Sequence, residues 1–109
     1  MAVERRGSGG PWEARYGYSR VVAAGGHAWV AGCTATVDGE VRHLGDPHAQ
    51  ALTAFATALD ALAEVGFTVA DVVRTRMYAI HAEDIDAASL LLECFLVPHA
   101  EPVFLVYDQ

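Results

Sequence analysis

The chain has 109 residues, of which 53% are hydrophobic and 19% are charged, and this composition predicts one folded globular domain. Its formal net charge of -7 argues against nucleic-acid binding, which needs clustered cationic side chains to neutralise phosphates. The chain contains no lysine, so chemistry that requires a Schiff-base lysine of this chain is excluded.

The first fifteen residues are expected to form a flexible N-terminal segment, because the Gly-Ser-Gly-Gly-Pro run at 7–11 disfavours regular structure. No apolar core of a signal peptide follows Met1–Gly10, and no apolar run is long enough to span a membrane. We therefore expect a cytoplasmic protein without a membrane partner. Two cysteines, Cys33 and Cys94, are too few for a disulfide framework and are expected to be free thiols.

Three strands are predicted next. Residues 18–24 are rich in β-formers and end at the turn signal Gly25-Gly26, and residues 27–36 form the second strand. Asp38-Gly39 predicts a tight hairpin turn, because both positions tolerate a positive φ. Residues 40–44 then return as a short third strand.

A helix is predicted from Asp46-Pro47 to Gly66. Asp46 can accept hydrogen bonds from the free N–H groups of the first turn, and Pro47 suits the first helical position. Gly66 supplies the C-terminal stop. The apolar residues recur at helical spacing: Leu52, Phe55, Ala56, Leu59, Leu62 and Ala63.

The remaining elements complete a β-β-β-α-β-α-β order. Residues 71–80 alternate as a strand, residues 83–97 are expected to form a second helix, and residues 103–107 a last strand. Helices separated by strands would pack on one face of the sheet. The other face carries Arg74, Arg76 and Tyr78 among aliphatic residues, and this mixture favours an interface between copies of the chain over open solvent.

Six local sequences, in their order and spacing, resemble the Rid/YjgF family, also labelled endoribonuclease L-PSP, over about residues 16–89. They are Gly17–Ser19, Trp29–Thr34, Asp46–Gln50, Leu59–Leu62, Val65–Phe67 and Asp71–Tyr78. The resemblance implies a chorismate-mutase-like α+β fold with a mixed sheet, two helices on one face and a homotrimeric barrel with sites between chains. It also implies hydrolysis of small reactive imines and enamines to ammonia and a keto acid, with no metal or organic cofactor. Residues 16–109 would then be a single Rid-like domain with an atypical, shortened C-terminus.

The resemblance places Tyr18, Gly32 and Cys33 at the catalytic centre. A tyrosine hydroxyl can bind substrate or orient water, and a glycine lets a ligand approach the backbone closely. The alternative for Tyr18 is a half-buried strand aromatic, and for Cys33 an ordinary buried thiol. The chain has five histidines (His27, His43, His48, His81 and His99), and none shows the spacing of a metal site.

Four further residues are expected to bind substrate: Thr34, Arg74, Arg76 and Ser89. The two guanidiniums would hold a substrate carboxylate, and the alternative role for them is salt bridging between subunits. They are needed because Glu101-Pro102-Val103 stands where the family has an Arg-Pro-Ala-like segment, whose arginine binds that carboxylate. A subfamily with a changed ligand and a frame-disrupted tail both remain open as explanations.

Two functions therefore compete. The first is a RidA-like imine/enamine hydrolase, and the second is a catalytically inactive small-molecule-binding protein on the same scaffold. Ribonuclease activity, which the older family label suggests, is disfavoured by the charge of -7 and the lack of lysine.

Overall fold

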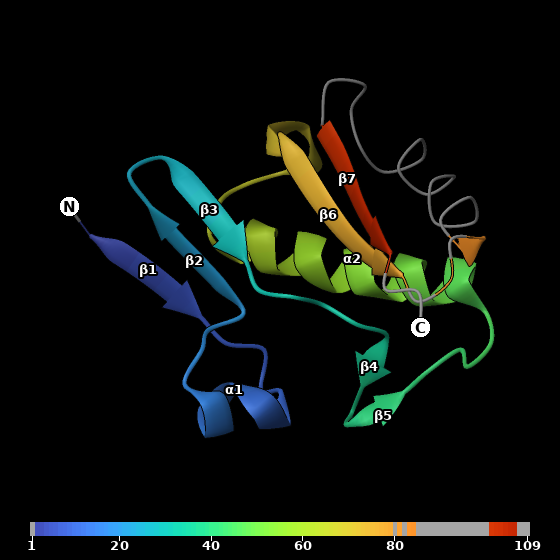
Figure 1. Cartoon of the computed structure of the whole chain (residues 1–109). Helices are drawn as coiled ribbons and strands as arrows, with labels where there is room; N and C mark the ends of the chain where they lie inside the picture. Colours follow the sequence, from blue (N-terminus) through green and yellow to red (C-terminus); the bar gives the residue numbers. More distant parts are fainter. Residues whose placement is uncertain (1, 80, 82, 85–100, 107–109) are drawn as a thin grey trace.

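The computed structural model describes residues 2–79, 81, 83–84 and 101–106, and its helices and strands follow one another in an α+β order (Figure 1). The elements are β1 (Val3–Arg6), α1 (Pro11–Tyr16), β2 (Val21–Ala24), β3 (His27–Val30), β4 (Thr36–Val37), β5 (Glu40–Val41), α2 (Pro47–Glu64), a 3-10 turn (Val69–Asp71), β6 (Arg74–Ala79) and β7 (Glu101–Val106). Within this part of the chain, no helix is both long and apolar enough to cross a membrane.

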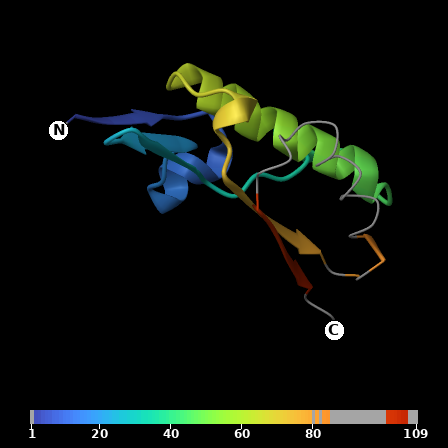
Figure 2. The ribbon, with the colours of Figure 1, turned by 90° about the horizontal axis from the view of Figure 1, so that it is seen from above.

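Strands β1, β2 and β3 form an antiparallel sheet in that order, and α2 covers one of its faces. Val21, which pairs with Val30, is fully buried on the covered face. The next residue pair, Val22 with Trp29, points to the opposite face, where Trp29 is 59% exposed. Figure 2 shows α2 running along one side of the strands.

Residues 2–15, which the glycine-rich run predicts to be flexible, contain strand β1 and most of helix α1. Strand β1 pairs with β2 along its whole length. The Glu13 carboxylate, in α1, accepts hydrogen bonds from the Ser8 N–H (2.9 Å), the Ser8 hydroxyl (2.6 Å) and the Gly10 N–H (2.8 Å). These three bonds offset the conformational freedom of the glycines that suggested disorder.

The predicted strand over residues 27–36 is interrupted. Strand β3 ends at Val30, because its partner β2 begins at Val21, and the segment 31–35 leaves the sheet. The predicted turn at Asp38-Gly39 is confirmed by positive φ angles of 52° and 79°. It joins β4 to β5, which is shorter than the strand predicted over 40–44.

The predicted start of α2 is confirmed. The Asp46 carboxylate accepts a hydrogen bond from the Ala49 N–H at 3.1 Å, and Pro47 occupies the first helical position. The Gln50 side chain adds a bond to the His43 carbonyl at 2.9 Å, which fastens the preceding loop to the helix. Gly66, with φ at 86°, follows the end of the helix as predicted.

The buried stripe of α2 is displaced from the predicted one. Ala61 is 5% exposed, whereas Leu52 is 38% exposed, and Ala56 and Ala63 are also exposed. The hydrophobic spacing therefore predicts the helix correctly but its covered face only in part, because alanines also recur outside the predicted stripe and weakly distinguish neighbouring orientations.

Strand β6 begins at Arg74, later than predicted, because Asp71 instead closes a turn in which its carboxylate accepts the Thr68 N–H at 2.7 Å. The predicted alternation along β6 is confirmed: Arg74, Arg76 and Tyr78 are exposed and the residues between them are half-buried. Strand β7, predicted at 103–107, runs parallel to β6. The predicted second helix at 83–97 lies outside the described residues.

Candidate functional site

Arg20 lies at the centre of a cluster that contains three of the seven predicted site residues, Tyr18, Gly32 and Cys33. Its Nη1 donates to the carbonyl of Gly32 at 2.6 Å and to that of Ala31 at 3.3 Å, and it lies 3.5 Å from the Cys33 Sγ. The Arg20 carbonyl in turn accepts the Ala31 N–H at 2.9 Å. Arg20 precedes β2 and the segment 31–34 follows β3, so the antiparallel pairing of these strands brings the two together.

Tyr18 stacks against the same guanidinium, whose Cζ lies 5.6 Å from the centre of the tyrosine ring. The end of α1 sets its position. Gly17 adopts the left-handed conformation that ends the helix, and the N–H groups of Gly17 and Tyr18 both donate to the Glu13 carbonyl. The Tyr18 side chain is 37% exposed, so one part of the ring packs on Arg20 while another part reaches solvent.

Gly32 is exposed, and a Cβ atom built on it would meet nothing within 4 Å. The backbone is therefore open to a ligand at this point. Thr34 lies two residues further on, and its hydroxyl is 2.7 Å from the hydroxyl of Thr36, with either atom able to donate. A hydroxyl that already shares a proton with a neighbour can still accept a hydrogen bond from a ligand.

Cys33 is a half-buried thiol that has hydrogen-bonding contacts with Arg20 and with the Ala31 carbonyl. Its Sγ donates to the Ala31 carbonyl at 3.3 Å. Burial raises the pKa of the Cys33 thiol above its ordinary value, the Arg20 guanidinium opposes that rise, and the Glu13 carboxylate adds to it. A raised pKa keeps the sulfur protonated at neutral pH, which suits a residue that lines a site better than a nucleophilic thiolate.

Sequence reasoning missed Arg20, Ser8 and Glu13. The Arg20 Nε lies 3.4 Å from the Ser8 hydroxyl oxygen, which itself donates to Glu13. Two signals could have found these residues. Arg20 is two positions from Tyr18, the spacing of side chains on one face of an extended segment. Glu13 is three positions after Gly10, the spacing at which a glutamate returns to the N-cap backbone.

The other predicted binding residues are not part of this cluster within the described chain. Arg74 and Arg76 lie on the exposed face of β6, in the sheet formed with β7. The parallel register pairs Arg74 with Glu101, the residue that occupies the position expected for an arginine. Ser89 lies outside the described residues.

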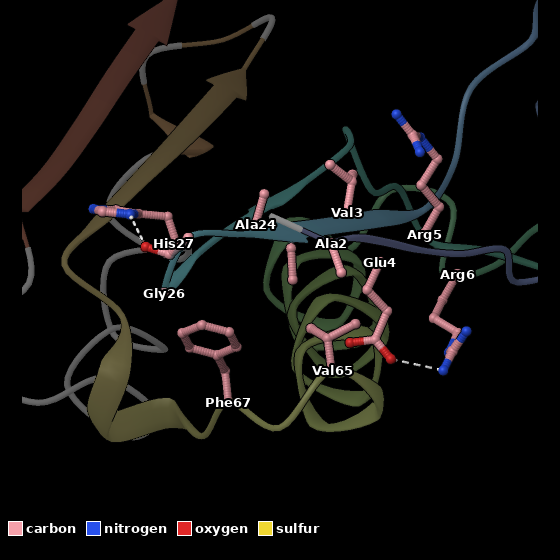
Figure 3. Close-up of a pocket in the computed structure, with 12 residues that line it drawn as sticks. Ala2, Val3, Glu4, Arg5, Arg6, Ala24, Gly26, His27, Val65 and Phe67 are labelled. Atoms are coloured by element: carbon pink, nitrogen blue, oxygen red, sulfur yellow. Dashed lines mark hydrogen bonds and ion pairs between the residues drawn. The ribbon is translucent and has the colours of Figure 1, made fainter.

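Two hollows lie next to the described residues of β1, β2 and α2, and neither is lined by Tyr18, Gly32 or Cys33. An open depression of about 650 Å³ lies between the turn of β2 and β3 and the end of α2. Figure 3 shows Phe67 pointing toward Gly26 from one side, with Glu4 paired to Arg6 at 2.7 Å on another. A smaller cavity of about 160 Å³ touches Ser8 and Arg20.

Among the residues that the structure describes, no three His, Cys, Asp or Glu side chains are grouped to hold a metal ion.

Comparison with known proteins gives concordant matches. The family model described as endoribonuclease L-PSP matches residues 11–106. An uncharacterized protein of Streptomyces coelicolor is 45% identical over 86 residues, which are 79% of this chain and 64% of that protein. The chain thus spans less than two thirds of the length of this curated relative.

Solved structures show the same fold. A member of the YjgF/YER057c/UK114 family from Mycobacterium tuberculosis superposes with a TM-score of 0.82 at 29% identity, over 96% of this chain and 84% of that one. A YjgF family protein from Neisseria meningitidis gives 0.72 at 20% identity, over 100% of this chain and 82% of that one. The predicted α+β fold is confirmed, and the chain belongs to the endoribonuclease L-PSP family, which includes the YjgF proteins.

Proposed function

We propose that this protein hydrolyses small reactive imines and enamines, releasing ammonia and a keto acid. The observation that supports this best is the convergence of Tyr18, Gly32 and Cys33 on one guanidinium, within a fold of this family. An enamine would first tautomerise to the imine. Water would then add across the C=N bond, its oxygen to the carbon and one proton to the nitrogen; the proton of the new hydroxyl would pass to the nitrogen as the C–N bond breaks, which releases ammonia and leaves a C=O group.

The Tyr18 hydroxyl is the group best suited to assist the proton transfers, because it can both donate and accept a hydrogen bond. The open backbone at Gly32 would allow the small substrate to lie close to the chain. Cys33, with its raised pKa, would line the site as a neutral thiol. Thr34 would add a hydroxyl to the wall next to it.

Arg74 and Arg76 would supply the carboxylate anchor from a neighbouring copy of the chain. Both are exposed on one face of β6, where two guanidiniums two residues apart offer several parallel N–H donors to a carboxylate. This role depends on a homotrimer, which the exposed sheet faces support. Trp29 is 59% exposed, Tyr78 56% and Val3 45%, and such apolar faces are commonly covered by another subunit.

The pairing of Arg74 with Glu101 favours a second candidate, a catalytically inactive protein that binds a small molecule on the same scaffold. With a glutamate at this position of the sequence in place of the family's arginine, the chain lacks the usual anchor for a substrate carboxylate. Ribonuclease activity has less support, because the chain carries a net charge of -7 and its cations are seven arginines without a lysine.

The test is the hydrolysis of a 2-imino acid that an amino-acid oxidase generates in the presence of a scavenging amine. The rate of keto-acid release is followed with and without the purified protein. Tyr18→Phe is expected to lower the acceleration by about a hundredfold or more, since general acid–base assistance contributes roughly 10²- to 10⁴-fold. Tyr16→Phe is the matched control, because Tyr16 is 65% exposed and stacks on Trp12 of α1.

The outcomes separate the two candidates. Acceleration by the wild type and the Tyr16→Phe variant, lost in Tyr18→Phe purified in the same way, supports the hydrolase. No acceleration by a folded protein that still binds a small carboxylate overturns the hydrolase and supports the binding role.

A further inference from the structure

The segment after β3 depends on one side chain to hydrogen-bond two of its carbonyls. At Val30 the pairing with β2 ends, and the carbonyls of Ala31 and Gly32 are met by one nitrogen of Arg20. Hydrogen bonds from a charged donor are stronger than those between neutral groups. Arg20 alone can therefore hold the segment 31–32 in place after its pairing with β2 has ended.

The same guanidinium is held on its other sides. Its Cζ lies over the Tyr18 ring, and its Nε donates to the Ser8 hydroxyl oxygen at 3.4 Å, which is itself fixed by a 2.6 Å bond to Glu13. Arg20 therefore has contacts with the tyrosine, with the backbone of the segment 31–33 and with the N-terminal segment. Few of its rotamers can satisfy all of these contacts together.

We propose that Arg20 is a positioning residue, which fixes the spacing between the Tyr18 ring and the open backbone at Gly32. This inference rests on the proposed hydrolase function for its effect on turnover, but its structural part stands independently. Arg20 acts through Tyr18 and through the segment 31–33, and it need not touch the substrate. The planar guanidinium can reach both carbonyls and the ring at once, whereas a lysine ammonium on its flexible stem cannot do so with the same geometry.

The first arm of the test measures the geometry without any turnover. Cys33 is alkylated over a range of pH in a Cys94→Ser background, so that only one thiol reacts. Removing the guanidinium in Arg20→Met is expected to raise the apparent pKa of the Cys33 thiol, because Arg20 favours the thiolate. It is also expected to raise the limiting rate at high pH by about tenfold or more, because the lost charged hydrogen bonds make local opening easier.

Matched variants show whether the effect belongs to Arg20. Arg15→Met removes another ring-stacked guanidinium, one that lies 5.5 Å from the Trp12 and Tyr16 rings, and should leave Cys33 alkylation unchanged. Arg20→Lys keeps the charge, so the pKa of the Cys33 thiol should stay close to that of the wild type. The segment 31–33 should nevertheless be less restrained, so the limiting alkylation rate should rise. Ser8→Ala removes only the contact of Arg20 with the Ser8 hydroxyl, so it should give a smaller rise in the limiting alkylation rate. This variant tests the proposal if Arg20→Met does not fold.

The second arm measures imine hydrolysis. A positioning role predicts that Arg20→Met lowers kcat by about tenfold or more while KM changes little, because misplacement of assisting groups affects the transition state. A raised KM with unchanged kcat would overturn the proposal in favour of direct substrate binding by Arg20. An unchanged limiting alkylation rate in folded Arg20→Met, Arg20→Lys and Ser8→Ala would also overturn it. If the wild type has no turnover, the proposed function fails, and the alkylation arm still decides the role of Arg20.

Discussion

The Ser8 hydroxyl donates a 2.6 Å hydrogen bond to the Glu13 carboxylate, and this pair joins the segment after β1 to helix α1. Glu13 is 8% exposed, so its carboxylate depends on Ser8 and on the N–H of Gly10 for the interactions that water would otherwise provide. The bond with Ser8 is the largest influence that lowers the pKa of Glu13, and burial opposes it.

This lowered pKa predicts a specific acid sensitivity. In the unfolded chain the Glu13 carboxyl has its ordinary pKa of 4.5, and in the folded protein its pKa is lower. The contribution of Glu13 to stability is therefore fully present above pH 4.5. That stabilisation is lost as the pH falls through the lower, folded value. Glu13→Gln should therefore be less stable than the wild type at neutral pH, and the difference in urea midpoint should shrink as the pH falls below 4.5.

Glu4→Gln is the control for this experiment, because Glu4 pairs with Arg6 at the surface, where ion pairs contribute little. Its urea midpoint should follow that of the wild type at every pH. A constant difference between Glu13→Gln and the wild type down to the acid limit would contradict a lowered pKa for Glu13.

A second prediction concerns the start of α2. Asp46→Ala removes the acceptor of the Ala49 N–H and should lower the free energy of unfolding by about 1 kcal/mol. Asp46→Asn keeps an acceptor at the same place and should cost only a small part of that. Urea denaturation of the three proteins measures both effects, and equal losses in the two variants would show that the charge, rather than the cap, is what matters.

A third prediction tests the proposed assembly. Trp29→Glu places a charge on the uncovered face of the β1–β2–β3 sheet and should shift the protein to a smaller species in light scattering after size-exclusion chromatography. Trp12→Glu is a close control, since Trp12 is 50% exposed but lies on α1. A wild type with the mass of one chain across a dilution series would exclude the oligomer, and equal effects of the two variants would exclude this face as its interface.

A fourth prediction concerns the open backbone of the site. Gly32→Ala adds a methyl group that meets nothing within 4 Å, so the thermal midpoint should remain close to that of the wild type. If a substrate lies against this backbone, the methyl group occupies its place, and KM for the imine should rise. Normal kinetics in this variant would show that no substrate approaches the chain at Gly32.

Much of the fold could be predicted because local chemistry decided it. The turn at Asp38-Gly39 needs residues that tolerate positive φ, and the helix start at Asp46-Pro47 needs a cap and a residue without an N–H. These signals lie within a few residues of each other. The faces of β6 were also predictable, because alternation along a strand requires no knowledge of its partner.

The parts that sequence reasoning missed depend on contacts between distant residues. The N-terminal elements β1 and α1 are joined to the rest of the chain and to each other by the pairing of β1 with β2 and by the contacts of Glu13, neither of which a glycine-rich run reveals. The cluster at Arg20 joins positions eleven to thirteen residues apart through the β2–β3 hairpin. The resemblance points to Tyr18, Gly32 and Cys33 individually, and the spacing of Arg20 from Tyr18 is the local signal for the guanidinium, but its contacts with the segment 31–33 depend on the strand pairing.

The parallel pairing of β6 with β7 has a consequence for how the chain folds. A hairpin such as β2–β3 can close as soon as its few residues leave the ribosome, but β6 ends at Ala79 and its partner begins only at Glu101. Closing the loop between the two strands costs conformational entropy, and this cost comes before the strand pair contributes any stability. We therefore expect the β1–β3 hairpins and α2 to acquire protection from hydrogen exchange first during refolding, and the β6–β7 pair to acquire it last.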